Sequence, residues 1–149
     1  MTRFAAVAVV AVAFGGCGRD AGDRADRPAP PEAEAEVAAR VMIVEPADGA
    51  EVDAGPLLVV METEGVEIVA AGNMDAGTGH HHLIVDADVD WTLPIPNDPG
   101  VHYHMGQAQK EFTLADLAPG RRRIIAVVAD GVHIPLDPPV SDTITVVVR

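Results

Sequence analysis

Apolar and polar residues alternate along much of the chain in the manner of short β-strands. The clearest example is the run DTITVVVR from Asp142, in which Ile144, Val146 and Val148 share one side of an extended chain. Other apolar or β-branched runs are LLVVMET from Leu57, VEIVA from Val66, HLIVD from His82 and RRRIIAVVAD from Arg121. These runs predict strands that turn one side to a core.

Turn-forming residues separate these runs at short intervals, as in ADG at 47–49, NDPG at 97–100 and DG at 130–131. Residues 106–117 contain helix formers, but we expect a strand at 111–114 because LADLAPG leads directly into the arginine-led strand. The pattern therefore predicts an all-β fold, an antiparallel β-sandwich of about seven short strands over residues 41–149.

The first 40 residues follow a different pattern. Arg3 precedes an apolar run from Phe4 to Phe14 and then small residues, which predicts a secretory signal peptide over residues 1–16. That run is too short to span a bilayer. Residues 17–40 are mainly Ala, Pro, Asp, Glu and Arg, which cannot bury a core, so we predict a disordered tether.

The single cysteine, Cys17, directly follows the predicted signal peptide and excludes an internal disulfide. The surrounding AFGGC resembles the lipobox of bacterial lipoproteins, although Phe14 stands where leucine is usual. The resemblance implies lipidation of Cys17 and a membrane anchor, with the domain exported to the periplasm or the cell surface. Gly18 resembles the pattern that sorts lipoproteins to the outer membrane. The alternative is cleavage nearby by an ordinary signal peptidase.

The formal net charge of −13 limits the classes of partner. An acidic surface repels nucleic acid and anionic lipid, so we expect neither as a partner. It suits cations, but it also serves solubility alone. Aromatic residues make up only 3% of the chain, so the core must consist mainly of Val, Ile and Leu.

The candidate chemistry lies in the histidines. Because side chains alternate along a strand, His80 and His82 share a side, and so do His102 and His104. Two such pairs on neighbouring strands would offer four imidazoles, and His133 could close the site from a loop. We predict a metal site formed by His80, His82, His102, His104 and His133, and a structural role for His81.

Copper and zinc are the expected ions, since both accept neutral imidazole nitrogen at about 2.0 Å. Met105 would favour copper if it faced the same side as His104, and Asp86, on the side of His80, could ligate or orient a histidine. Two alternatives stay open. The histidines could bond to carbonyl or carboxylate groups in a structural role, or line a groove for an organic ligand with Trp91, Tyr103 and Gln107.

Several motifs together resemble a bacterial domain-of-unknown-function family of small exported proteins. They are G-H-H-H-L-x-x-D from Gly79, H-M-G from His104 where the family has H-aromatic-G, and D-x-x-H-x-P-x-D-P-P-V from Asp130. The resemblance implies an Ig-like sandwich in the cell envelope, and His80, His81, His82, His104 and His133 match its signature histidines. Leu136 stands where a further histidine is common. The layout also looks like that of periplasmic copper-carrier sandwiches.

Three functions compete at this point. The leading hypothesis is a non-enzymatic, lipid-anchored envelope protein that binds a transition metal. The second is an interaction or ligand-binding module in which the histidines are structural. The third is a metalloenzyme, because H-x-H-x3-D weakly resembles the metal motif of cupins, but no second cupin motif is present. Nucleophilic hydrolysis is disfavoured, since Ser141 is the only serine and G-x-S-x-G is absent.

Overall fold

The computed structural model describes residues 37–149. The predicted signal peptide, Cys17 and most of the predicted tether lie outside the described residues. Within residues 37–149, no helix is long and apolar enough to cross a membrane.

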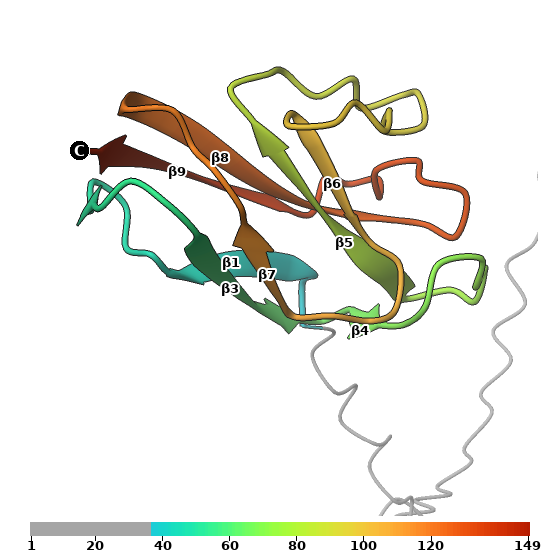
Figure 1. Cartoon of the computed structure of the whole chain (residues 1–149). Coiled ribbons are helices and arrows are strands. Elements are labelled where there is room, and N and C mark those ends of the chain that lie inside the picture. Colours follow the sequence, from blue (N-terminus) through green and yellow to red (C-terminus); the bar gives the residue numbers. More distant parts are fainter. Residues whose placement is uncertain (1–36) are drawn as a thin grey trace, which may run out of the picture. The chain divides into compact units, whose positions relative to one another are not determined.

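The described part of the chain consists of β-strands joined by turns and loops (Figure 1). The strands are β1 (Arg40–Glu45), β2 (Glu51–Val52), β3 (Leu57–Glu64), β4 (Glu67–Ile68), β5 (Thr78–Val85), β6 (His102–Met105), β7 (Glu111–Leu114), β8 (Gly120–Ala129) and β9 (Ser141–Val148). Seven of them have four or more residues, which agrees with the number expected from the sequence.

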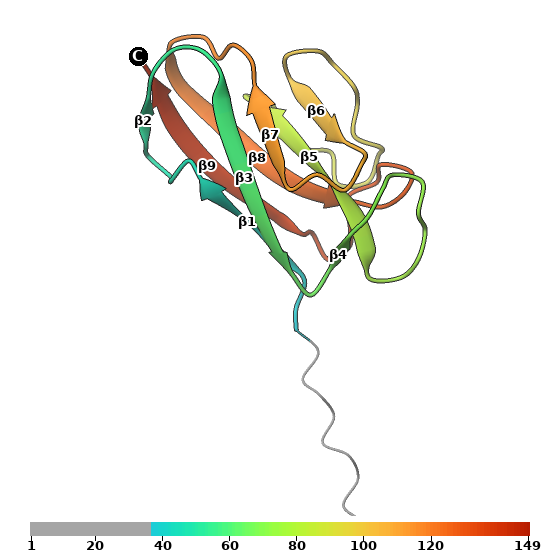
Figure 2. The same ribbon diagram turned by 60° about the horizontal axis from the view of Figure 1, so that its bottom comes forward.

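Two sheets face each other (Figures 1 and 2). The smaller has the antiparallel order β1-β3-β7, and the larger has the order β2-β9-β8-β5-β4, with β6 also pairing with β5. The predicted all-β sandwich is confirmed. It is not purely antiparallel, however, because the two-residue strands β2 and β4 pair in parallel with β9 and β5. Such short pairings leave almost no periodicity in the sequence to detect.

The main core lies between the sheets and is built from aliphatic side chains. Strand β9 follows the predicted alternation, with Ile144, Val146 and Val148 buried in this core. From β5, Leu83 and Val85 point into it. Because neighbours on a strand point to opposite sides, Ile84 lies on the outer side of the larger sheet.

That outer side carries a second, smaller core. Ile84 packs there with Ile125, Val127 and Ala129 of β8. Ile95, from the segment between β5 and β6, packs on the same cluster and covers it. Strand β5 is therefore buried on both sides. A polar side chain on its outer side lies next to the apolar residues of this second core.

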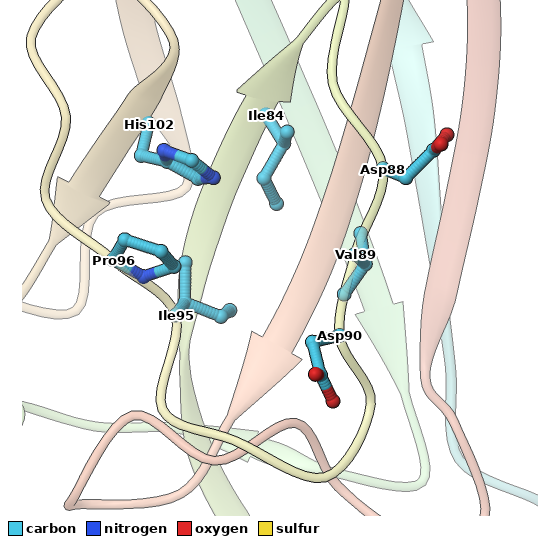
Figure 3. A pocket seen from close by; sticks show the side chains of 7 residues that line it. All are labelled: Ile84, Asp88, Val89, Asp90, Ile95, Pro96 and His102. Atoms are coloured by element: carbon cyan, nitrogen blue, oxygen red, sulfur yellow. The ribbon is translucent and has the colours of Figure 1, made fainter.

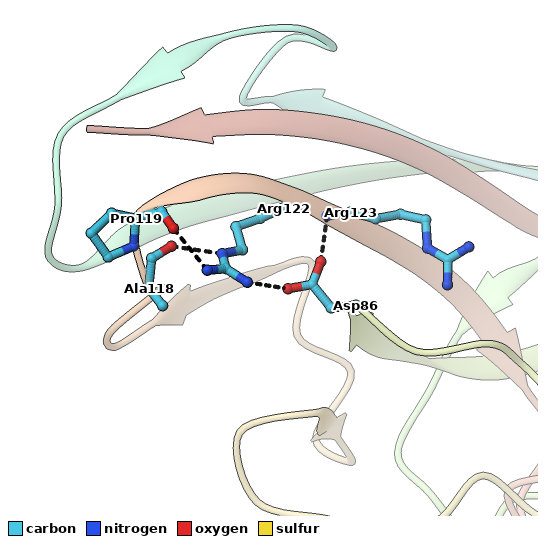
Figure 4. Close-up of polar contacts among 5 residues, drawn as sticks. All are labelled: Asp86, Ala118, Pro119, Arg122 and Arg123. Carbon is cyan, nitrogen blue, oxygen red and sulfur yellow. Dashed lines mark hydrogen bonds and ion pairs between the residues drawn. The ribbon is translucent and has the colours of Figure 1, made fainter.

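Asp86 fixes the end of β5 to β8 (Figure 4). Its carboxylate accepts hydrogen bonds from the backbone N–H of Arg123 at 2.8 Å and from the Arg122 guanidinium at 2.9 Å. Partial burial opposes ionisation, but these bonds outweigh it and hold the pKa of Asp86 below its ordinary value. Its φ of 54° lies in the left-handed region, which Asp tolerates better than most residues.

Replacing Asp86 by alanine should destabilise the domain by about 2 kcal/mol, because the Arg123 N–H loses its acceptor and alanine is strained at positive φ. Asp88 provides the matched control, since it pairs with the same Arg123 but has a 92% exposed side chain. Asp88→Ala should leave stability nearly unchanged. Urea unfolding of both variants measures the difference, and equal losses would contradict this role for Asp86.

Candidate metal centre

Four histidines from three segments meet on the outer side of the larger sheet. His80 and His82 come from β5, His104 comes from β6, and His133 comes from the loop between β8 and β9. One ring nitrogen from each lies within 4.8 Å of the corresponding nitrogens of the others. The four therefore form a group that can hold a metal ion.

Strand register explains how three of them meet. His80 and His82 are two residues apart and so share the outer side of β5. Antiparallel pairing of β5 with β6 places His104 directly opposite His82. Directly paired residues on one side of a sheet have neighbouring side chains, so the three rings are brought together by the backbone alone.

His133 reaches the group through a tight turn. The carboxylate of Asp130 accepts hydrogen bonds from the backbone N–H groups of Val132 and Ile134, each at 2.9 Å. The N–H of His133 donates to the Asp130 carbonyl at 3.0 Å, and the His133 carbonyl accepts from Ile95 at 2.8 Å. His133 itself has a φ of 71°, a conformation that costs a non-glycine residue energy and is concentrated at functional sites.

The rings surround a common centre. The six distances between the four ring centroids all lie between 4.8 and 5.5 Å. The Nε2 atoms of His80 and His82 are 3.0 Å apart, close enough for one to donate a hydrogen bond to the other. The Nδ1 atoms of these two rings are buried and have no hydrogen-bond partner among the described residues.

Burial divides the group into a floor and a rim. His80 and His82 are 1% and 2% exposed and lie beside the second core. His104 is exposed and His133 is partly exposed. A cavity of about 120 Å³ opens next to His82, His104 and His133, and its remaining lining is Ile95, Pro96 and Asn97. An ion can therefore approach from the rim and meet His82, which lies beside His80.

Burial keeps the imidazoles of His80 and His82 neutral. Burial, followed by repulsion from His104 and His133, lowers the pKa of His80 from 6.5 to about 4. Burial, followed by repulsion from His80 and His104, lowers the pKa of His82 to about 3. Burial also lowers the pKa of His104. Neutral imidazole is the form that binds metal, so the buried pair is ready to bind at neutral pH.

Gly106 supports the position of the His104 ring. A β-carbon added at Gly106 would lie 2.7 Å from Nε2 of His104, which is too close for real atoms. Any side chain there would push the ring away. The H-M-G and D-x-x-H motifs contain Gly106 and Asp130 but do not reveal their roles, because each role depends on contacts that form only in the folded chain.

His102 does not join the four, contrary to the prediction from the sequence. It pairs with Ile84, two residues along β6 from the His82–His104 pair. Its Nδ1 lies 3.4 Å from a carboxylate oxygen of Asp98. The ring faces a separate cavity of about 140 Å³, which Ile84, Ile95 and Pro96 also line (Figure 3).

Three other residues with a predicted role near the site, His81, Met105 and Asp86, also lie outside the group of four. His81 is fully buried, and its Nδ1–H donates to the carbonyl of Gln109 at 2.9 Å, as a structural histidine would. Met105 is fully buried in the main core, on the opposite side of β6 from His104, so the argument from Met105 for copper is lost. Asp86 is engaged by the two arginines and does not join the group.

The alternative of a groove for an organic ligand relied on Trp91, Tyr103 and Gln107, and none of these three residues lines the two cavities beside the histidines. Tyr103 packs on Phe112 beside the main core, with ring centroids 5.4 Å apart. The lining comes instead from the Ile95–Pro96 segment.

Fold and site together define a small β-sandwich with four histidines gathered on the outer side of one sheet. Residues 59–149 match the family described as Domain of unknown function (DUF4399), and the chain belongs to this family. The match includes all four histidines. No curated protein matches the chain.

One solved structure is similar to the chain, a crystal structure of an engineered protein determined at 1.98 Å by the Northeast Structural Genomics Consortium. It is 19% identical, with a TM-score of 0.45 over 77% of this chain. This chain spans about a fifth of its length, 21%.

The metal-free domain should lose stability as the pH falls from about 6.5 towards about 4. Unfolded histidines bind protons near pH 6.5, whereas native His80 and His82 do so only near pH 4 and 3, so acid favours the unfolded state. The loss should be on the order of a few kcal/mol. Urea unfolding across this range measures it. His82→Leu removes one of the two groups and should flatten the pH dependence; an unchanged slope would contradict the assignment.

Proposed function

We propose that this protein is a non-enzymatic cell-envelope lipoprotein whose β-sandwich binds a transition metal ion, copper or zinc. The observation that carries the proposal is the four-histidine group of His80, His82, His104 and His133, with its ligand atoms within 4.8 Å of one another. The lowered pKa values of His80 and His82 support it, because these two ligands lose no affinity to proton competition at neutral pH.

The number of protein donors supports binding rather than catalysis. Catalytic zinc sites keep one position for water, with three protein ligands, whereas four protein ligands close the site. Here four imidazoles already surround the centre. The cupin-like alternative used Asp86 as a ligand, and the bonds from Arg122 and Arg123 to this carboxylate weigh against it.

Titration of the full, metal-free chain with Zn(II) and Cu(II) should show saturable binding of one ion at pH 7.5. His104→Ala removes a ligand from the exposed rim and should weaken the affinity by more than about a hundredfold, beyond what loss of an outer-sphere partner costs. His133→Asn should do the same without backbone strain, since asparagine tolerates positive φ. Calorimetry measures all of these affinities.

His102→Ala is the matched control for this titration, because it removes a histidine from the same side of β6 outside the group. It should bind metal as the unmodified chain does. Absence of saturable binding by the unmodified chain would contradict the proposal, and so would equal losses in the His102 and His104 variants.

An interaction or ligand-binding module is the second candidate function. The observation that favours it is the exposure of large apolar side chains on the loops around the site, with Trp91 41%, Leu93 58% and Val132 51% exposed. In that case the histidines would be structural. Replacing His80 and His82 together by alanine would then lower thermal stability, while metal ions would have no effect on the unmodified chain.

The anchor is tested on the mature protein. We expect mass spectrometry to find Cys17 as the N-terminal residue, carrying acyl chains, with the protein in the membrane fraction. Cys17→Ser removes the site of acylation and should release the protein from the membrane fraction. An unmodified N-terminus downstream of Cys17 would contradict the lipoprotein assignment.

A further inference from the structure

We infer that the four-histidine group forms a cage of imidazole rings around a position for tetrahedral Zn(II). This cage selects against the flattened coordination that Cu(II) and Ni(II) prefer. This inference rests on the proposed metal-binding function and adds the identity of the ion. It follows from the arrangement of the rings, from their donor atoms and from the contacts that hold them in place.

The arrangement is the first argument. Four points whose six separations are nearly equal form a tetrahedron, and the six centroid separations here span only 4.8–5.5 Å. A square of rings, as in square-planar copper or nickel, would have two diagonals about 1.4 times as long as its sides. The observed spread is much smaller than that, so the rings enclose a tetrahedral position.

The size of the cage is the second argument. The centre of a tetrahedron with these edges lies about 3.1 Å from each ring centroid. A nitrogen-bound imidazole on zinc, with a bond of about 2.0–2.1 Å, places its centroid about 3.2 Å from the ion. The ring centroids therefore lie at the radius that a zinc ion with four imidazoles requires, and binding would draw the ligand nitrogens, which lie within 4.8 Å of one another, towards the centre.

The donor atoms are the third argument. Cu(I) also accepts tetrahedral sites, but it is selected by thiolate and thioether ligands. Met105 points into the main core, and residues 37–149 contain no cysteine. Four imidazole nitrogens without sulfur suit the borderline ion Zn(II).

Two contacts resist flattening of the cage. The His104 ring lies against the backbone at Gly106, and the His133 turn is closed by hydrogen bonds to Asp130. His80 and His82 are fixed by β5, which pairs with β6 on one edge and β8 on the other. A Cu(II) ion would have to move at least one of these segments to reach its preferred geometry, which lowers its usual advantage over Zn(II).

Cobalt substitution of the full chain tests the geometry, because Co(II) reports its coordination in the visible spectrum. We expect the intense d–d absorption of tetrahedral Co(II), displaced by one equivalent of Zn(II). X-ray absorption at the zinc edge should show four nitrogen neighbours at about 2.0 Å. His102→Ala should keep the cobalt spectrum. Gly106→Ala keeps every imidazole but displaces His104, and should weaken or alter the spectrum.

The outcomes separate this inference from the proposed function. Weak octahedral Co(II) bands, or a tetragonal Cu(II) complex that Zn(II) cannot approach in affinity, would overturn the tetrahedral assignment while leaving metal binding intact. Failure of Co(II), Zn(II) and Cu(II) alike to bind would instead overturn the proposed function. Retention of the unmodified cobalt spectrum in Gly106→Ala would contradict the role given to the backbone beneath His104.

Discussion

Strand β5 is buried on both of its sides, and the candidate site depends on that burial. One side supplies Leu83 and Val85 to the main core, and the other places His80 and His82 beside Ile84 in the second core. The alternation of side chains along one strand thus serves stability and chemistry at once. A shift of register by one residue would exchange the two sets and destroy both.

Burial of two neighbouring imidazoles makes it unfavourable to protonate either ring, so both stay neutral at neutral pH. The same desolvation that lowers the pKa of His82 to about 3 leaves its nitrogen free of a competing proton at neutral pH. A bound ion would supply the positive charge that the site excludes as protons, and would satisfy ring nitrogens that otherwise face one another. The more exposed His104 and His133 leave the ion a route in from solvent.

The sequence predicted the sandwich and most of the group, because both depend on alternation, which is local. It predicted that His80 and His82 share a side of one strand and that His104 would come from another. Alternation does not tell which residue of β6 pairs with His82, and the register shows that His104 does so while His102 pairs with Ile84. The support from Gly106 and Asp130 likewise depends on contacts that form only in the folded chain.

The proposed metal-binding function is tested most directly by the metal content of the protein itself. The full chain should be produced in its native host and purified without a polyhistidine tag, then subjected to elemental analysis alongside the His104→Ala, His133→Asn double variant. The account predicts close to one zinc ion per chain in the unmodified protein and almost none in the double variant. Equal metal content in the two proteins, or none in either, would contradict it.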